Sequence, residues 1–206
     1  MAYSDFSLAR ARDAFGLTLA ESRDLFATVT PIAPSDTLTT VLADYIPLAT
    51  AIATEKARSE FLIAPILAEV RRQLNNQISL FSGSEFSVDP DQGLQGFCDY
   101  IISASREQLL ITAPVMIIVE AKREDIIGGL GQCIAAMVAA QLFNQREGNA
   151  VRKIYGAVTT GTNWKFLILE DKTVSVDRVE YFINQLDRIL GILMEPFQLN
   201  LTTSVG

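Results

Sequence analysis

The fold class follows from one apolar run near the middle of the chain, Val115-Met116-Ile117-Ile118-Val119-Glu120-Ala121-Lys122. Every residue up to Val119 is apolar, whereas a strand with one face in water alternates apolar and polar side chains. The run has the length of a strand. It therefore predicts a central strand whose two faces are both covered.

Helix and strand patterns occur on both sides of this run. Further strands are expected at residues 78–81, 86–88, 94–103, 154–159, 165–169 and 174–176. Helices are expected at residues 49–74, 128–144 and 178–194. Pro65 should kink or split the first of these helices, because proline lacks a backbone N–H group. This order predicts an α/β or α+β domain, in which helices flank a mixed sheet.

The first 45 residues are interpreted as an N-terminal helical extension, ahead of a domain at residues 46–206. Thr18 and Glu21 have the spacing of a capping box, in which each side chain accepts a hydrogen bond from a free backbone N–H group of the other. Ser35 is a candidate N-terminal cap. We therefore expect short helices and turns over residues 1–35, followed by a helix after Ser35.

The composition fits one globular domain. Of the 206 residues, 49% are hydrophobic and 20% are charged, which is too apolar for a disordered chain. The chain has no histidine, which excludes Ser-His-Asp catalysis, Cys-His catalysis and histidine zinc sites. Its two cysteines cannot form a four-cysteine zinc site. A resident metal would therefore have oxygen ligands, which Mg²⁺, Mn²⁺ and Ca²⁺ prefer.

Neither a membrane span nor a secretory signal is predicted. No apolar run reaches the ~20 residues that cross a bilayer, and the N-terminal segment carries charges without an apolar core. Cys98 and Cys133 lie in apolar segments, so both are expected to be buried and reduced. A cytoplasmic protein without membrane contact is the resulting expectation. Its net charge of −7 disfavours tight nonspecific DNA binding but does not exclude a local site.

Two charged residues end the central run. Glu120 and Lys122 are two positions apart, so both project from one face of a strand. Charged strand ends are ordinary where a strand reaches water. An unpaired charge at the end of a buried strand, however, costs several kcal/mol. The pair is therefore a candidate site only if further residues join it.

Asp99 is the residue that strengthens this hypothesis, because strands disfavour Asp and its neighbours are apolar. It is expected to share a strand face with Ile101, opposite Cys98 and Tyr100. If its strand is the antiparallel neighbour of the central one, Asp99 lies opposite Glu120. Two converging carboxylates repel each other unless a cation lies between them. The alternatives are a hydrogen-bonded core or edge Asp, or a structural ion pair with Lys122 in an unrelated α/β domain.

Together these residues resemble a known family. Gly96-Phe97-Cys98-Asp99-Tyr100, followed by the central run, is similar to the Asp and Glu-x-Lys signature of the PD-(D/E)XK nuclease superfamily. Glu55, followed by Arg58 and an Ile-x-Pro-x-Leu run at residues 63–67, resembles the opening helix in the N-terminal nuclease region of type I restriction enzymes. Gln132 is placed like a glutamine that often follows the signature. The resemblance covers roughly residues 50–170.

The resemblance implies a restriction-endonuclease-like fold and a role for each matched residue. Asp99 and Glu120 would bind Mg²⁺ or Mn²⁺ together with the main-chain carbonyl of Ala121, and Glu55 would bind a second metal or a metal-bound water. Lys122 would activate water and stabilise the phosphate, and Gln132 would position water or phosphate. The implied function is metal-dependent hydrolysis of a phosphodiester bond in DNA, or in RNA.

A non-enzymatic function is the main alternative. The same fold can serve as a catalytically inactive module that binds a partner protein or assembles a homo-oligomer, since a fold does not determine a function. The acidic net charge favours this alternative. The apolar, Ala-rich segment at residues 130–143 is its candidate interface.

Overall fold

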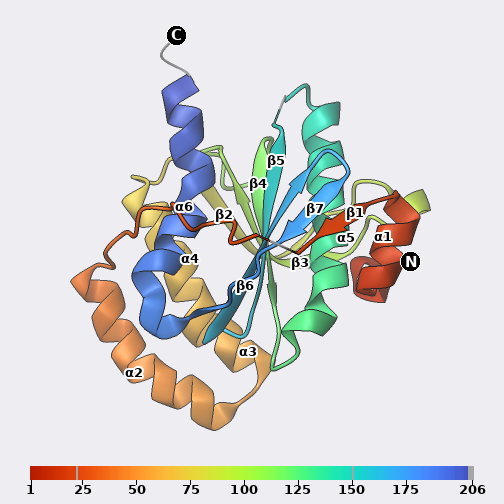
Figure 1. Ribbon diagram of the computed structural model, residues 1–206. Coiled ribbons are helices and arrows are strands. Elements are labelled where there is room, and N and C mark those ends of the chain that lie inside the picture. Colours follow the sequence, from red (N-terminus) through yellow and green to blue (C-terminus); the bar gives the residue numbers. More distant parts are fainter. Residues whose placement is uncertain (22, 150, 204–206) are drawn as a thin grey trace.

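A computed structural model describes residues 1–21, 23–149 and 151–203 of the chain (Figure 1). Its centre is a mixed sheet of eight strands in the order β1-β7-β6-β5-β4-β3-β2, with β8 paired to β6. The strands are β1 (Thr18–Ala20), β2 (Ser79–Glu85), β3 (Phe97–Ser103), β4 (Val115–Ala121), β5 (Lys153–Thr159), β6 (Asn163–Glu170), β7 (Thr173–Val176) and β8 (Tyr181–Phe182).

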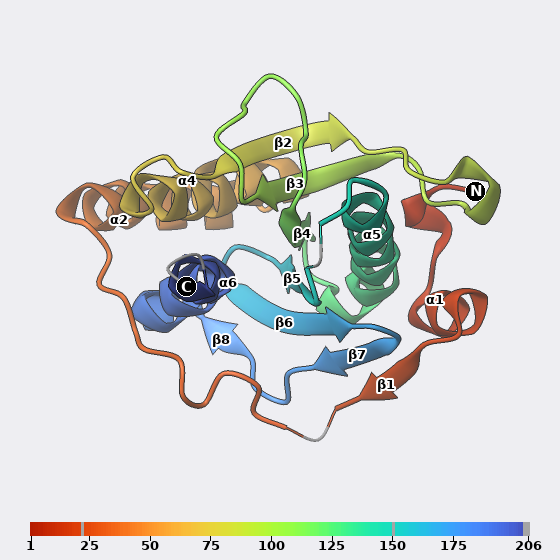
Figure 2. The same cartoon turned by 90° about the horizontal axis from the view of Figure 1, so that it is seen from above.

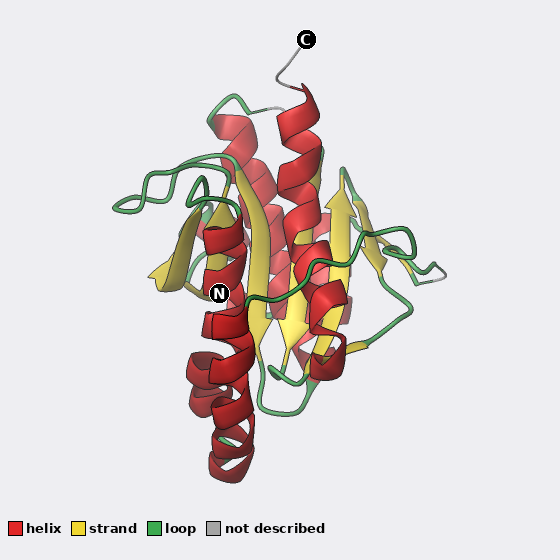
Figure 3. Ribbon diagram, turned by 90° about the vertical axis from the view of Figure 1, so that its left-hand side faces the viewer, coloured by secondary structure: helices red, strands yellow, loops and turns green. Residues whose placement is uncertain are grey.

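Helices cover both faces of this sheet. The α-helices are α1 (Leu8–Phe15), α2 (Asp36–Ile52), α3 (Glu55–Arg58), α4 (Ala64–Gln73), α5 (Ile126–Arg146) and α6 (Leu186–Thr203). Viewed from above, α5 and α1 lie on one side and α2, α4 and α6 lie on the other (Figure 2). Figure 3, from the α2 side, shows helices in front of the strands. The fold is thus the mixed sheet flanked by helices that the sequence predicts.

β4 lies in the middle of the sheet and is buried at every position, as its apolar run predicts. It pairs antiparallel with β3 and parallel with β5. A parallel pair requires a crossover, and α5 provides it. The side chains of β4 enter two cores, because Ile118 packs on the α5 side while Val119 packs on the side of α4 and α6.

Helix α5 is packed on more than one side. Among the described residues it is the one helix long and apolar enough to cross a membrane, but 61% of its most apolar window is buried inside the protein. One side contacts β4 and β5, and another contacts η1 (a 3₁₀ turn at Tyr3–Asp5) and α1. At Gly131 an added Cβ would lie 2.3 Å from the carbonyl oxygen of Phe6. These contacts make α5 a helix of the protein core.

The two cysteines are free and buried, as predicted. Cys133 lies on the inner side of α5, where its sulfur is 3.7 Å from the carbonyl oxygen of Ala157 in β5. Burial raises the pKa of the Cys133 thiol. Both residues therefore act as small apolar core side chains.

The helical stretch expected at residues 49–74 consists of several pieces. Helix α2 ends where Ala53 takes a left-handed conformation, and the Thr54 side chain caps α3 by accepting a hydrogen bond from the Ala57 N–H group. A π-helical segment, Ser59–Ile63, then leads into α4. Pro65 lies in the first turn of α4, directly after the π-helical segment, whereas the break in the stretch lies at Ala53 rather than at this proline.

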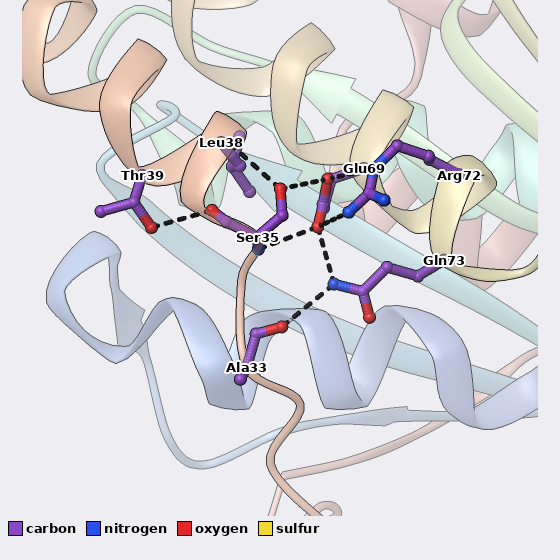
Figure 4. Close-up of polar contacts among 7 residues, drawn as sticks. All are labelled: Ala33, Ser35, Leu38, Thr39, Glu69, Arg72 and Gln73. Carbon is purple, nitrogen blue, oxygen red and sulfur yellow. Dashed lines mark hydrogen bonds and ion pairs between the residues drawn. The ribbon is translucent and has the colours of Figure 1, made fainter.

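The start of α2 is fastened to α4. Ser35 caps α2 as predicted, accepting a hydrogen bond from the Leu38 N–H group at 3.2 Å. Its own N–H and hydroxyl groups donate to the carboxylate of Glu69, which Arg72 and Gln73 also contact (Figure 4). The carboxylate therefore joins two helices through charge-assisted hydrogen bonds.

The N-terminal segment differs from its prediction. The capping box at Thr18 is wrong, because Thr18–Ala20 forms strand β1, which pairs parallel with β7. Phe6 and Phe15 pack in the α5-side core. The predicted boundary after residue 45 falls inside α2. The division into an extension and a domain stays a prediction.

Two other boundaries also differ. The short strands expected at residues 78–81 and 86–88 are replaced by one strand, β2, at Ser79–Glu85. The closing helix begins at Leu186 rather than at residue 178, because Tyr181–Phe182 pairs with β6 as β8.

Candidate functional site

The predicted acidic pair lies on neighbouring antiparallel strands. Tyr100 of β3 pairs with Val119 of β4, so Asp99 and Glu120 both lie next to the last residue pair of this ladder. Glu120 is almost fully buried, with 2% of its surface exposed. The sheet thus brings together two acidic residues that are far apart in the sequence.

Lys122 lies directly beyond the end of β4 and contacts Glu120. Its Nζ atom donates to Glu120 Oε1 at 2.6 Å and to Gln132 Oε1 at 3.3 Å. Its backbone N–H donates to the carbonyl of Thr159 at the end of β5, at 2.8 Å. The main chain is therefore anchored on β5, while the ammonium group is held between a strand and α5.

A close approach of α5 makes the Gln132 contact possible. A Cβ added at Gly129 would lie 2.7 Å from Val158 Cγ1 and 2.9 Å from Lys122 Cε. Only a glycine leaves room there for the stem of Lys122. Gly129 therefore allows α5 to lie against the lysine, with Gln132 one turn farther along the helix.

The backbone around Asp99 is irregular. Cys98 packs in the α5-side core, whereas Tyr100 packs in the opposite core, so the alternation of β3 breaks at Asp99. The prediction that Cys98 and Tyr100 share a face is therefore wrong. On the neighbouring strand, Gly83 has φ +58 between the pairs Ser82–Tyr100 and Ser84–Cys98. The reason for the error is this local distortion, which a period of two does not describe.

The irregularity turns Asp99 toward the end of β4. Its Oδ2 atom accepts a hydrogen bond from the Ala121 N–H group at 2.8 Å. The same residue lines a cavity of about 330 Å³ between β3 and α3. Asp99 therefore contacts the Glu120 strand and also borders an open space.

Glu55 lies across this cavity, on the first turn of α3. The cavity is lined by Glu55, Lys56, Ser59, Glu60, Ala64, Ser82, Gly83, Asp99, Tyr100 and Ala121. The negative charge of Glu55 also acts on Lys122, whose pKa it helps to raise. Of the five predicted site residues, Glu55 and Asp99 line the cavity, whereas Glu120, Lys122 and Gln132 contact one another outside its lining.

Burial and charge repulsion dominate the electrostatics of Glu120. Burial above all, and then the neighbouring Asp99, raise the pKa of Glu120 to about 8, although Lys122 opposes the shift. Burial alone would lower the pKa of Lys122, but the attraction of Glu120 outweighs it and raises this pKa. One ammonium group therefore does not offset the cost of burying Glu120 beside Asp99.

The donor set is suitable for a hard divalent cation. Among the described residues, no group of three or more acidic or cysteine side chains is arranged around one point as metal ligands. Mg²⁺, however, is commonly held by one or two carboxylates, with water and substrate phosphate completing its shell. Asp99 and Glu120 supply two carboxylates, and the pKa of Glu120 is raised first by burial and then by the charge of Asp99. The residues present therefore fit Mg²⁺ or Mn²⁺.

Sequence reasoning missed two residues of this neighbourhood. The Tyr100 hydroxyl contacts both the side chain and the backbone of Ser59, at 2.6 Å and 3.0 Å. Nothing in the spacing of these two residues links them, since they belong to a strand and to a π-helical segment. Their contact depends on how α3 packs against the sheet.

Comparisons with protein-family models, with curated proteins and with solved structures found no match. No family is therefore assigned to the chain, and the site is described from its own geometry.

Proposed function

We propose that this protein is a divalent-metal-dependent nuclease of the PD-(D/E)XK type, which hydrolyses a phosphodiester bond of DNA. One observation carries the proposal. The Asp99 carboxylate accepts a hydrogen bond from the Ala121 N–H group at 2.8 Å, next to Glu120, and Lys122 Nζ lies 2.6 Å from Glu120. The proximity of two carboxylates and one lysine supports the roles that the sequence resemblance implies.

Each residue has a role that its position supports. Asp99 and Glu120 would hold Mg²⁺, which supplies polarisation of the phosphoryl oxygen and a lower pKa for bound water. Lys122 places a positive charge where negative charge develops on the phosphate. Gln132 orients the ammonium group of Lys122 through its 3.3 Å contact. Glu55, on the far wall of the cavity, would hold a second ion or a water.

A cytoplasmic location belongs to the same proposal. The two thiols are free and buried, which suits a reducing compartment. The net charge of −7 predicts weak nonspecific attraction to nucleic acid, so binding would depend on the metal more than on a basic surface.

The test is cleavage of plasmid DNA and of single-stranded DNA in the presence of Mg²⁺ or Mn²⁺. Wild type should cleave, and Lys122→Ala should lose at least ~100-fold in rate, as removal of one charge-stabilising donor does elsewhere. Lys153→Ala is the matched control. Lys153 is the first residue of β5 and forms an exposed ion pair with Glu170, away from the site. Activity that persists in Lys122→Ala would contradict the proposal.

An exposed apolar groove favours a second candidate, a module that binds a partner protein or a second copy. The groove has a volume of about 390 Å³ and is lined by apolar residues that include Phe81, Phe86, Leu110 and Phe143. Leu109, at its rim, is 90% exposed. Sedimentation of wild type and of Leu110→Asp would test self-association: a dimer lost in the variant supports this candidate.

A further inference from the structure

Tyr100 connects the strand that carries Asp99 to the helical segment that follows Glu55. The tyrosine ring is buried, with 2% of its surface exposed. Its hydroxyl lies 2.6 Å from Ser59 Oγ and donates to the Ser59 carbonyl at 3.0 Å. Because a buried hydroxyl without a partner is costly, this double contact fixes the separation of the two elements.

Ser59 is the first residue of the π-helical segment. In that segment the Ala64 N–H group bonds to the Ser59 carbonyl, five residues back. The next residue, Pro65, has no N–H group to continue a regular helical pattern. Single π-turns of this kind are rare and are frequent at functional sites. The Ser59 carbonyl therefore accepts two hydrogen bonds, one from its own helix and one from Tyr100.

Helix α3 is the first turn of a helical run that continues through the π-helical segment into α4. Two contacts join this first turn to the rest of the protein. At its C-terminal end, Arg58 donates to the carbonyl of Thr160 at 3.2 Å. On the side of this helical run that faces the sheet, Ser59 contacts Tyr100 of β3. These two contacts together orient the turn that carries Glu55.

The contact and the candidate ligands border the same space. Glu55, Ser59, Asp99 and Tyr100 all line the cavity of about 330 Å³. Tyr100 follows Asp99 directly, and Ser59 lies one helical turn after Glu55. A shift of α3 against β3 would therefore change the separation of the two carboxylates.

We propose that Tyr100 is a positioning residue: through Ser59 it holds Glu55 across the cavity from Asp99, and so sets the affinity of this cavity for a divalent cation. The inference rests on the proposed function, because it assumes that the cavity binds a metal. Tyr100 itself contributes no ligand. Changes to residues that orient metal ligands typically lower metal affinity by about 10–100-fold.

The test is Tyr100→Phe, which removes the hydroxyl and keeps the ring. Tyr181→Phe is the matched control: Tyr181 is 1% exposed and donates to Asp177 at 3.1 Å, on β8 and outside the cavity. We expect calorimetry to give an affinity for Mn²⁺ at least ~10-fold weaker in Tyr100→Phe, and unchanged in Tyr181→Phe. Amide hydrogen exchange should accelerate over residues 55–63 in Tyr100→Phe only.

A double-mutant cycle separates positioning from a general loss of stability. Ser59→Ala should weaken Mn²⁺ binding in wild type and have little additional effect in Tyr100→Phe, because Tyr100→Phe already removes the side-chain contact that Ser59→Ala breaks. An Mn²⁺ affinity of Tyr100→Phe within twofold of that of wild type would overturn this inference and leave the proposed function standing. A wild-type chain that binds no Mn²⁺ would overturn the proposed function, and this inference with it.

Discussion

Lys122 Nζ lies 2.6 Å from Oε1 of Glu120, a carboxylate of which only 2% is exposed to solvent. Across the strand pair, Asp99 adds a second negative charge. Burial raises the pKa of Glu120 to about 8 in spite of the lysine, so the chain by itself holds this carboxylate at a cost. A cost of this kind is common at functional sites, and it leads to the predictions below.

Removing the lysine should destabilise the protein most at high pH. In Lys122→Met the Glu120 carboxylate loses its partner, and we expect the free energy of unfolding to fall by about 1–3 kcal/mol at pH 9. At pH 6 the loss should be smaller, because Glu120 can take up a proton. Urea denaturation at both pH values measures the difference. Lys56→Met is the control, since Lys56 forms an exposed pair with Glu60 and its loss should have no measurable effect. Equal losses at both pH values would argue against a buried charge at Glu120.

The stability of wild type should fall as the pH rises from about 4.5 to 8. The pKa of Glu120 is raised from 4.5 to about 8 in the folded protein, so the folded state binds more protons than the unfolded state in this window. The stability that depends on this proton is complete below pH 4.5 and is lost as the pH rises through 8. We expect a contribution on the order of 2–4 kcal/mol. In denaturation measured at several pH values, the free energy of unfolding of Glu120→Gln should change less across this window than that of wild type. Parallel curves for the two proteins would contradict the raised pKa of Glu120.

Glu69 should have the opposite pH dependence. Burial alone would raise its pKa, but hydrogen bonds from Arg72, Gln73 and Ser35 outweigh burial and lower the pKa of Glu69 to about 2 (Figure 4). The stability that this carboxylate provides is therefore present above pH 4.5 and is lost as the pH falls toward 2. On acidification, Glu69→Gln should unfold at a higher pH than wild type. Its free energy of unfolding at pH 7 should be lower by about 1–2 kcal/mol. Glu147→Gln, an exposed control, should follow wild type.

Gly129→Ala should disturb the site through packing alone. The new Cβ would lie 2.7 Å from Val158 and 2.9 Å from Lys122 Cε, so α5 or the lysine must shift. We expect a loss of about 1–3 kcal/mol, the usual cost of overpacking, together with weaker Mn²⁺ binding. Thermal denaturation and calorimetry measure the two effects. A stabilised variant with unchanged Mn²⁺ binding would show that α5 has free space at this point.

Sequence patterns predicted those parts of the fold that burial alone determines. Strand β4 is buried at every position because both of its faces are covered, so its apolar run located it in the sequence. Strand β1 was not predicted, because Thr18–Ala20 is a strand only by pairing with β7, far along the chain. The helix expected at residues 49–74 runs across the end of α2, since nothing in the sequence signals the left-handed conformation of Ala53.

The candidate site was predicted in part. The antiparallel pairing of the strands that carry Asp99 and Glu120 was expected from two strands joined by one connection. The distortion at Asp99 and Gly83 was not expected, although it gives Asp99 access to both Ala121 and the cavity. The contact between Tyr100 and Ser59 depends on the packing of α3, which local spacing does not encode.

Titration of the protein with Mn²⁺ by calorimetry, at neutral pH and without nucleic acid, tests the central claim most directly. Asp99→Ala removes one of the two proposed carboxylates, and Asp44→Ala removes an exposed carboxylate on α2 as the control. The metal-site account predicts saturable binding by wild type and by Asp44→Ala, with binding lost in Asp99→Ala. Absence of binding by wild type, or equal binding by Asp99→Ala, would contradict it.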